Sequence, residues 1–277
     1  VGCTDPTACN YNPLASVSDN NCVYPGDPLC PDGPDLIVDS MALANSLYMD
    51  NMNVAANDCR VEENCLNGYG ERDIIRFSTH IKNIGNMDYY IGNPSANPDQ
   101  FDFINCHNHT HYKGYAEYKL YDVNGVELPI GFKNGFCVMD LECSGGGSFQ
   151  YGCSTMGITA GCGDIYSSGL DCQWIDVTDV DTGLYTFVNT ANWDNDPDAL
   201  GRMELNHLNN WAQLCIYIGK DANGAMYVNQ VPDCTPYLDC EGTLYGSAQP
   251  DCEGACAGAA LRGDLNSDVN QNVLDAH

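Results

Sequence analysis

The stretch Gly183–Ala191, GLYTFVNTA, is a short run of apolar and β-branched residues bounded by Asp, Gly and Asn. Two further stretches share its character, Asp73–Gly85 (DIIRFSTHIKNIG) and Tyr115–Val123 (YAEYKLYDV). Alternating apolar runs between turn residues are typical of β-strands, and no stretch carries a long helical period. We therefore predict a mainly β fold, a disulfide-clipped sandwich with long loops, for residues 31–236.

The composition bounds the compartment and the partners. The 277-residue chain has 17 cysteines, far above cytosolic usage, which favours an oxidising extracellular environment. Because no basic and apolar leader precedes Val1, we expect a mature exported chain. The net charge of −28 argues against nucleic acid as a partner and favours cationic ligands, or serves solubility in a salty medium. No apolar run approaches the roughly 18 residues of a membrane span.

Both ends of the chain differ from the middle. Residues 1–30 are predicted to form a small clipped module, similar to the short Cys- and Asp-rich repeats of secreted bacterial proteins. Residues 237–277 are predicted to form a Gly- and Cys-rich linker and a calcium loop that resembles half of a dockerin repeat. The side chains of this loop that carry oxygen have the spacing of calcium ligands. They belong to Asp264, Asn266, Asp268, Asn270, Asn272 and Asp275. Val269 stands where the turn usually has Gly, and the alternative is an acidic solvated tail.

The motif CHNHTHY, Cys106–Tyr112, contains three of the six histidines of the chain, His107, His109 and His111. In a strand, residues i, i+2 and i+4 lie on one face, so three imidazoles would converge on one transition metal. Imidazole ligands suit copper or zinc, and the spacing does not choose between them. The alternative is a solvent-facing polar strand.

Four segments resemble the catalytic domain of lysyl oxidases in their order and intervals. They are DCRVEENCL, CHNHTHY, GFKNGFCVMDLEC and GCGDIYSSGLDCQWIDVTDV, within roughly Asp35–Cys234. The resemblance implies that the metal at the three histidines is copper. It also implies a lysine tyrosylquinone, a cofactor made by crosslinking a lysine to an oxidised tyrosine. The matching residues are Lys133 in GFKNGFC and Tyr166 in GCGDIYSSGLDC.

The resemblance also implies disulfides and a calcium site. The expected disulfide pairs are Cys59–Cys65, Cys106–Cys153, Cys137–Cys143, Cys162–Cys172 and Cys215–Cys234. The other seven cysteines lie in the terminal segments, where spacing does not reveal the pairing. The implied calcium ligands are Asp35, Leu36 through its carbonyl, Glu204, Asn206, Asn209 and Asn210. Oxygen ligands suit a hard cation, although Asn206 stands where Asp is more usual and a polar turn is the alternative.

The activity implied by the resemblance is that of a secreted copper-dependent amine oxidase. Such an enzyme deaminates primary amines, peptidyl lysine among them, to aldehydes and releases hydrogen peroxide and ammonia. A cationic protein or amine substrate fits the acidic charge. One alternative is a non-catalytic structural or adhesive protein that reuses the fold and assembles through its terminal modules. Another is a copper or zinc binder that never forms the quinone. Ile104 and Tyr118 replace histidines of animal relatives, and the general base is unassigned.

Overall fold

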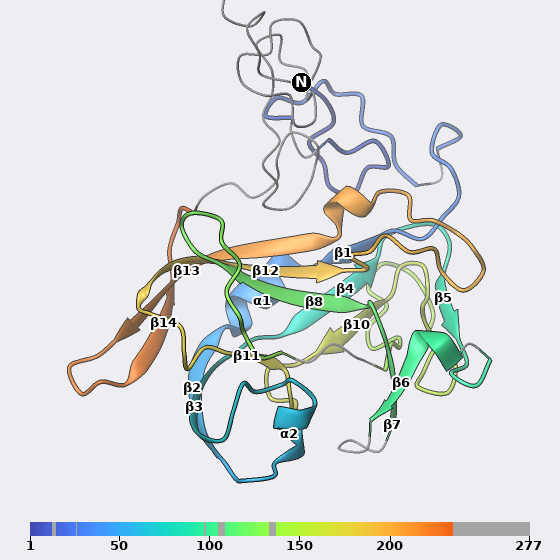
Figure 1. Cartoon of the computed structure of the whole chain (residues 1–277). Coiled ribbons are helices and arrows are strands. Elements are labelled where there is room, and N and C mark those ends of the chain that lie inside the picture. Colours follow the sequence, from blue (N-terminus) through green and yellow to red (C-terminus); the bar gives the residue numbers. More distant parts are fainter. Residues whose placement is uncertain (13–14, 26, 97, 105–108, 133–136, 235–277) are drawn as a thin grey trace, which may run out of the picture. The chain divides into compact units, whose positions relative to one another are not determined.

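Figure 1 shows the computed structural model of the chain, which describes residues 1–12, 15–25, 27–96, 98–104, 109–132 and 137–234. The predicted mainly β fold is confirmed. The strands are β1 (Leu36–Val38), β2 (Tyr48–Val54), β3 (Gly70–Arg76), β4 (Thr79–Asn83), β5 (Tyr89–Gly92), β6 (Phe101–Ile104), β7 (His109–Tyr112), β8 (Ala116–Tyr121), β9 (Met156–Ile158), β10 (Gly163–Tyr166), β11 (Trp174–Asp176), β12 (Gly183–Ala191), β13 (Trp211–Lys220) and β14 (Met226–Gln230). The short helices are α1 (Ser40–Ser46), α2 (Cys59–Glu62), η1 (Pro98–Gln100) and η2 (His207–Asn209).

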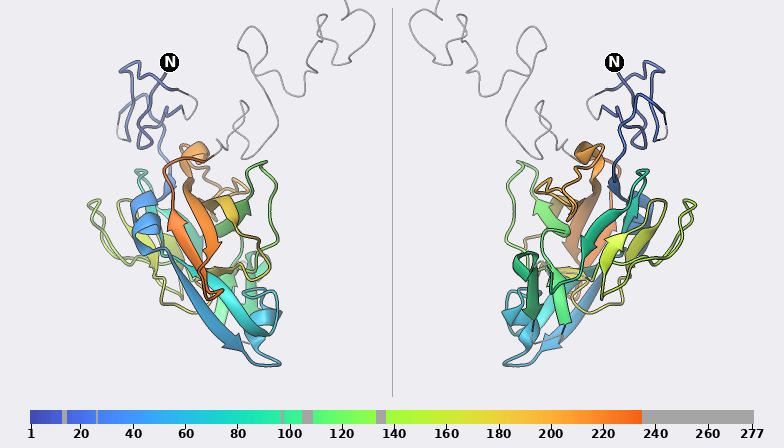
Figure 2. Two further views of the ribbon diagram at one scale, coloured as in Figure 1. Left: turned by 90° about the vertical axis from the view of Figure 1, so that its left-hand side faces the viewer. Right: turned by 90° about the vertical axis from the view of Figure 1, so that its right-hand side faces the viewer.

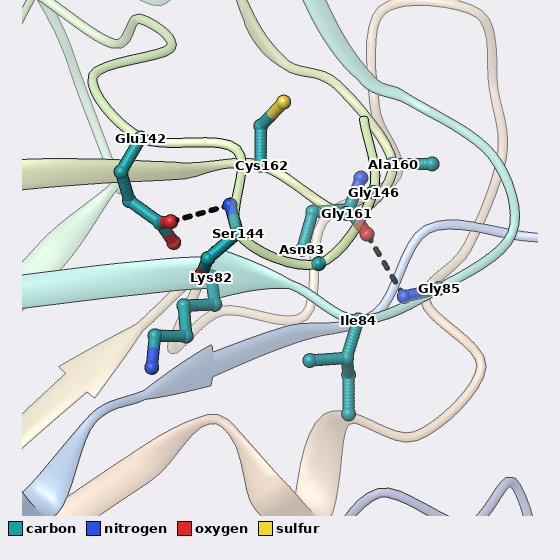
Figure 3. Close-up of a pocket in the computed structure, with 11 residues that line it drawn as sticks. Lys82, Asn83, Ile84, Gly85, Glu142, Ser144, Gly146, Ala160, Gly161 and Cys162 are labelled. Carbon is teal, nitrogen blue, oxygen red and sulfur yellow. Dashed lines mark hydrogen bonds between the residues drawn. The ribbon is translucent and has the colours of Figure 1, made fainter. Parts of the chain in front are cut away.

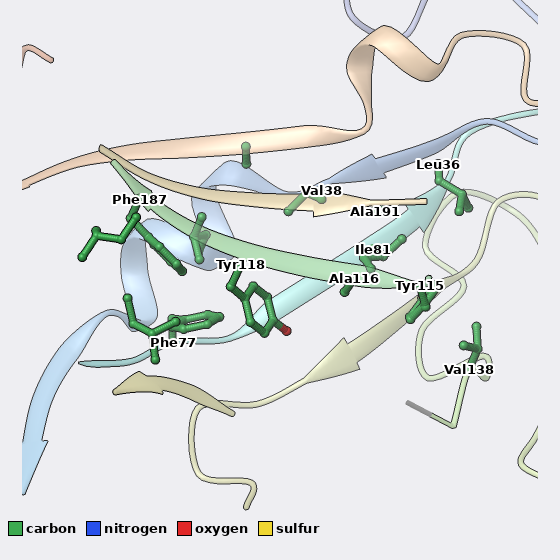
Figure 4. Close-up of a cluster of buried hydrophobic side chains, with 14 of the residues drawn as sticks. Leu36, Val38, Phe77, Ile81, Tyr115, Ala116, Tyr118, Val138, Phe187 and Ala191 are labelled. Carbon is green, nitrogen blue, oxygen red and sulfur yellow. The ribbon is translucent and has the colours of Figure 1, made fainter. Parts of the chain in front are cut away.

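Two antiparallel sheets enclose the main core. The larger has the order β14-β13-β12-β8 and the smaller the order β1-β4-β10. Because alternate residues of a strand face opposite sides, β12 sends Phe187 inward, where it packs against Phe77 with ring centroids 4.7 Å apart. Phe77 also packs edge-on against Tyr118 of β8, and all three residues have no exposed surface (Figure 4). Burying each such ring contributes about 1.5–3 kcal/mol before entropy is subtracted.

A third sheet, of order β11-β3-β2, has a small core of its own. Its centre is Trp174, which is fully buried and whose indole nitrogen donates to the carbonyl oxygen of Cys65 at 2.9 Å. The guanidinium of Arg76 lies 4.6 Å from the centre of the Trp174 ring. This arrangement ties β11 to the segment after α2, and Arg76 also donates to the carbonyl oxygen of Ser168 at 3.1 Å in the loop that follows Tyr166.

The pairing of several cysteines differs from the expectation. The structure joins Cys65 to Cys172, Cys137 to Cys153 and Cys143 to Cys162, and it contains the expected Cys215–Cys234 bond. The expected pairs Cys59–Cys65, Cys137–Cys143, Cys162–Cys172 and Cys106–Cys153 are therefore wrong. Cys59 is disulfide-bonded, whereas Cys106 lies outside the described residues.

These expected disulfide pairs are wrong because cysteines bond to partners that the fold brings close in space, and these are not the cysteines nearest in sequence. The backbone of Glu142 bridges Gly163, which brings the adjacent Cys143 and Cys162 to a Cα separation of 3.9 Å. Pairing of β11 with β3 likewise brings Cys172 to the segment that contains Cys65. Loops that fold back on each other thus select distant partners, because a disulfide needs a short Cα separation.

The N-terminal segment is clipped by Cys3–Cys22 and Cys9–Cys30. It contacts the β domain, by which we mean the described residues from 31 to 234, where Asn209 of η2 donates to the carbonyl oxygen of Pro6 at 2.8 Å, and the side views show it beside η2 (Figure 2). By internal contacts the chain divides into Val1–Cys234 and Thr235–His277. The predicted linker and calcium loop, Asp264 to Asp275, lie outside the described residues. Among the residues that are described, no helix is long and apolar enough to cross a membrane.

Candidate active site

Tyr166, the predicted quinone precursor, is the last residue of β10 and pairs with Thr79 of β4. Its hydroxyl donates a hydrogen bond of 2.6 Å to the carbonyl oxygen of Cys137. The residue is partly exposed, but its phenol is enclosed by protein. Burial and the carboxylate of Asp164 raise the pKa of Tyr166 well above its ordinary value. The strand pairing therefore presents a protonated phenol to the loop that contains Cys137.

Lys133, the predicted crosslinking partner, lies outside the described residues. Its chain neighbours are placed. Phe132 packs edge-on against Tyr118, with ring centroids 5.9 Å apart. On the other side, the carbonyl of Cys137 accepts the hydrogen bond of Tyr166. Lys133 and Cys137 are four residues apart in sequence, and four residues span at most about 14 Å.

Of the predicted copper ligands, His109 and His111 belong to β7, whereas His107 lies outside the described residues. β7 pairs with β6, with His109 opposite Ile104 and His111 opposite Asp102. The strand is present as predicted, and the two histidines are alternate residues of it. Copper binding at this strand stays a prediction.

A buried network of hydroxyl and amide groups lies behind Tyr166, and sequence reasoning missed it. The hydroxyls of Thr79 and Tyr118 are 3.0 Å apart. Gln173 and Asn189 donate side-chain hydrogen bonds to the Thr79 hydroxyl at 3.0 and 2.9 Å. All four residues are buried, so these mutual bonds offset the cost of removing polar groups from water. Because Thr79 is the strand partner of Tyr166, the network fixes the backbone on which the phenol is carried.

Asp164 is a second group that the sequence did not reveal. It is two residues before Tyr166 on β10 and is 1% exposed. Its Oδ2 accepts hydrogen bonds from the Tyr115 hydroxyl at 3.3 Å and the Met139 amide at 3.4 Å. Its Oδ1 is buried without a hydrogen-bond partner among the described residues. Burial raises the pKa of Asp164 to about 8, so this carboxyl exchanges its proton near neutral pH.

A pocket of about 540 Å³ lies at the other end of β10 (Figure 3). Its polar lining includes Lys82, Glu142 and Ser144, and backbone from Gly145, Gly146 and Gly161 forms one wall. None of the predicted catalytic or metal-binding residues lines it, and of the predicted disulfide cysteines Cys162 does. Cys162 of the pocket precedes β10 and Tyr166 ends that strand, so the pocket and the phenol are separated by its length.

The predicted calcium ligands come together around Glu204. Its Oε2 accepts from the backbone amide of Leu36 at 2.6 Å, and its Oε1 accepts from Asn192 and Asn210 at 2.6 and 2.7 Å. Burial raises the pKa of Glu204 to about 7. Asn206 instead caps η2, its side-chain oxygen accepting from the Leu208 amide at 3.0 Å.

Asp35 is the second carboxyl group of this cluster, and one of its two oxygens accepts a hydrogen bond. Its Oδ1 accepts from Asn209 at 3.1 Å, while its Oδ2 is buried and has no hydrogen-bond partner within the described part of the chain. The Oδ1 atoms of Asn209 and Asn210 are also buried, and no described residue donates a hydrogen bond to them. Burial, and then the charge of Glu204, raise the pKa of Asp35 to about 8. Two carboxyl groups and two amide oxygens, three of whose oxygen atoms lack a donor among the described residues, form a donor set that fits a hard cation.

The sequence of the chain is similar to proteins of one known family. A family model described as lysyl oxidase matches residues 34–223. The chain belongs to the lysyl oxidase family. Lysyl oxidase homolog 4 of Homo sapiens is 34% identical over 171 residues, which are 57% of this chain and 22% of the relative. Lysyl oxidase homolog 3A of Danio rerio is 33% identical over 192 residues, 65% of this chain and 26% of the relative.

The region that matches the lysyl oxidase family includes every strand from β1 to β13 and contains Tyr166 and Asp164, while β14 lies beyond it. This chain spans only about a quarter of the length of these relatives. A solved CARDB domain from Pyrococcus furiosus overlaps the chain with a TM-score of 0.26 and 14% identity, too low to bear on the fold. The six described disulfides fit an oxidising compartment.

Proposed function

We propose that this chain is a secreted copper-dependent amine oxidase that acts on primary amines, with peptidyl lysine as its substrate class. Amine, oxygen and water are converted to aldehyde, ammonia and hydrogen peroxide, one of each. The observation that carries the proposal is the hydrogen bond from Tyr166 to Cys137, because it directs the phenol to the loop that follows Lys133. Membership of the lysyl oxidase family supports the same reaction.

The chain's own residues would prepare the site. The pairing of β10 with β4 orients Tyr166, and the contact of Phe132 with Tyr118 anchors the chain before Lys133. The disulfide Cys137–Cys153 limits the motion of the chain after it, which lowers the entropy lost when the two side chains meet. Bound at His107, His109 and His111, copper would supply the oxidation chemistry of the cofactor, and imidazole donors suit it.

The net charge of −28 supports a cationic substrate, because a long-range negative field attracts amines in their protonated form. It does not by itself distinguish peptidyl lysine from a polyamine. Oxidised lysine side chains would crosslink extracellular proteins.

We also propose that Asp35 and Glu204 hold calcium with the amide oxygens of Asn209 and Asn210, and that this ion stabilises the fold. The oxygens of this cluster that lack a donor among the described residues support that role.

The deciding experiment is peptide mapping by mass spectrometry of the chain after loading with copper in air. We expect one crosslinked species that contains the peptides of Lys133 and Tyr166, and hydrogen peroxide production with a lysine-containing peptide. The same substrate with acetylated lysines and the variant Tyr166→Phe are the controls, and neither should give peroxide. If both peptides are recovered separate and unmodified, the proposal fails and a non-catalytic metal-binding scaffold is the better account.

A further inference from the structure

Asp164 and Tyr166 are placed as a proton acceptor and a proton donor. We propose that Asp164 accepts the phenolic proton of Tyr166 when this tyrosine is activated for conversion to the quinone. The inference rests on the proposed function and assigns a part of it to a residue that no sequence motif identified. It concerns the formation of the cofactor and not its later turnover.

The first support is the shared setting of the two side chains. Asp164 and Tyr166 are alternate residues of β10 and so lie on one face of the strand. Both reach the same short segment, since Tyr166 donates to the carbonyl of Cys137 and Asp164 accepts from the amide of Met139. The two groups also interact with each other electrostatically. One backbone segment thus holds phenol and carboxyl in register.

The second support is that, of the two acceptors that the described residues place near the phenol, Asp164 is the one that can keep a proton. The Cys137 carbonyl accepts a hydrogen bond, but a peptide carbonyl does not hold a proton at neutral pH. Asp164 offers a buried oxygen, Oδ1, that has no hydrogen-bond partner among the described residues. In the transfer, the phenolic O–H bond breaks and an O–H bond forms on the carboxylate. A phenolate and a neutral carboxylic acid remain.

The third support is the charge balance of the buried site. The transfer moves one negative charge from Asp164 to Tyr166 and changes no total charge, so it adds no further charge to a region of low dielectric. The titratable groups that interact with Asp164 are the hydroxyls of Tyr115, Tyr118 and Tyr166, and the Met139 amide also donates to it. No Lys, Arg or His whose side chain is described forms an ion pair with Asp164; the side chains of His109 and His111 are outside that set. His80, on the neighbouring strand, is bonded to Glu142 at 3.1 Å.

The inference predicts a pH dependence. Only ionised Asp164 can accept the proton, and burial raises the pKa of this group to about 8. Its ionised fraction rises about tenfold between pH 7 and pH 9 for such a pKa. With copper at saturation, the rate of quinone formation should rise by a similar factor over that range and then level off.

The test compares the wild-type chain with Asp164→Asn, which keeps the size of the side chain but removes the base. We expect quinone formation, followed by absorbance and by reaction with phenylhydrazine, to slow at least a hundredfold and lose its pH dependence. Copper stoichiometry and the thermal midpoint should change little, and Asp164→Glu should recover part of the rate. Asp198→Asn is the matched control, because Asp198 is equally buried but bonded to Arg202.

A second measurement, which needs no copper, tests the protonation of Asp164 independently of the rate of quinone formation. The infrared difference spectrum of metal-free protein between pH 6.5 and 9.5 should contain the carbonyl band of a protonated carboxyl group, part of which Asp164→Asn removes. Quinone formation by Asp164→Asn within threefold of the wild type would overturn the inference. If that variant does not fold, a wild-type rate that is flat between pH 7 and 9 overturns it and a rise supports it. A wild type that binds copper but forms no quinone refutes the proposed function instead.

Discussion

Phe132 packs edge-on against Tyr118, with ring centroids 5.9 Å apart. This contact joins the chain neighbour of one half of the candidate cofactor to the strands that carry the other half. Phe132 is the chain neighbour of Lys133, and the Tyr118 hydroxyl lies 3.0 Å from that of Thr79, the strand partner of Tyr166. One aromatic contact thus connects the loop that carries the lysine to the sheet that carries the tyrosine.

Replacing Phe132 with Ala should lower the yield of crosslinked cofactor. Without the ring, the loop before Lys133 loses its anchor on Tyr118, and a displacement of about 1 Å at a reacting group can cost about a hundredfold in rate. We expect at least a tenfold lower yield, measured by mass spectrometry after copper loading. Phe149→Ala is the control, because Phe149 is 65% exposed. Equal yields in the two variants would show that the contact does not position the lysine.

Replacing Tyr118 with Phe should destabilise the β domain. The change leaves the bonds of Thr79 and Gln173 to the lost hydroxyl unmade in a buried site, which costs about 1–3 kcal/mol. Urea unfolding measures the change, with Tyr48→Phe as the exposed control. A loss no greater than in the control would mean that the network re-forms without this hydroxyl.

Calcium should stabilise the chain, and more strongly as the pH rises. Without metal, Asp35 and Glu204 have pKa values raised to about 8 and about 7, so the folded state binds protons that the unfolded state releases above about pH 4. Their contribution to stability is present at low pH and is lost as the pH rises through these folded values. Calcium requires the ionised carboxylates and should offset that loss.

The thermal midpoint with calcium or with a chelator, at pH 5.5, 7 and 8.5, tests this dependence. We expect the gap between the two conditions to widen with pH. It should close in Asp35→Asn but not in Asp233→Asn, whose side chain is exposed. A midpoint that ignores calcium at pH 8.5 would rule out the ion at this cluster.

The disulfide Cys65–Cys172 should stabilise the fold more than Cys215–Cys234. The sequence separations are 107 and 19 residues, and closing the longer loop restricts the unfolded chain more, by roughly 1.5 kcal/mol in the chain-entropy treatment. Urea unfolding of the two double Cys→Ala variants measures the difference. The order would be reversed if strain or residual unfolded structure dominates. Peptide mapping without reduction should recover Cys65 joined to Cys172.

Local patterns predicted the strands well, because alternation and turn residues act over a few neighbours. GLYTFVNTA forms β12 over the full stretch, and His109 and His111 lie on a strand as expected. One feature of the sequence does indicate the buried network around Thr79. Asn189 shares a face of β12 with Phe187, so a polar residue stands at an inward position and marks a buried hydrogen-bond network.

The sequence by itself determined the mainly β fold, the oxidising compartment and the family, since these follow from local periodicity, cysteine content and motif order. Tertiary structure alone decided which cysteines pair, because partner choice depends on which loops the sheets bring together. It also decided that Asp164 is buried beside Tyr166 and that Asp35 meets Glu204 across 169 residues of chain. Burial changes the proton affinity of these carboxyl groups, and burial is a property of the packed fold and not of any short stretch.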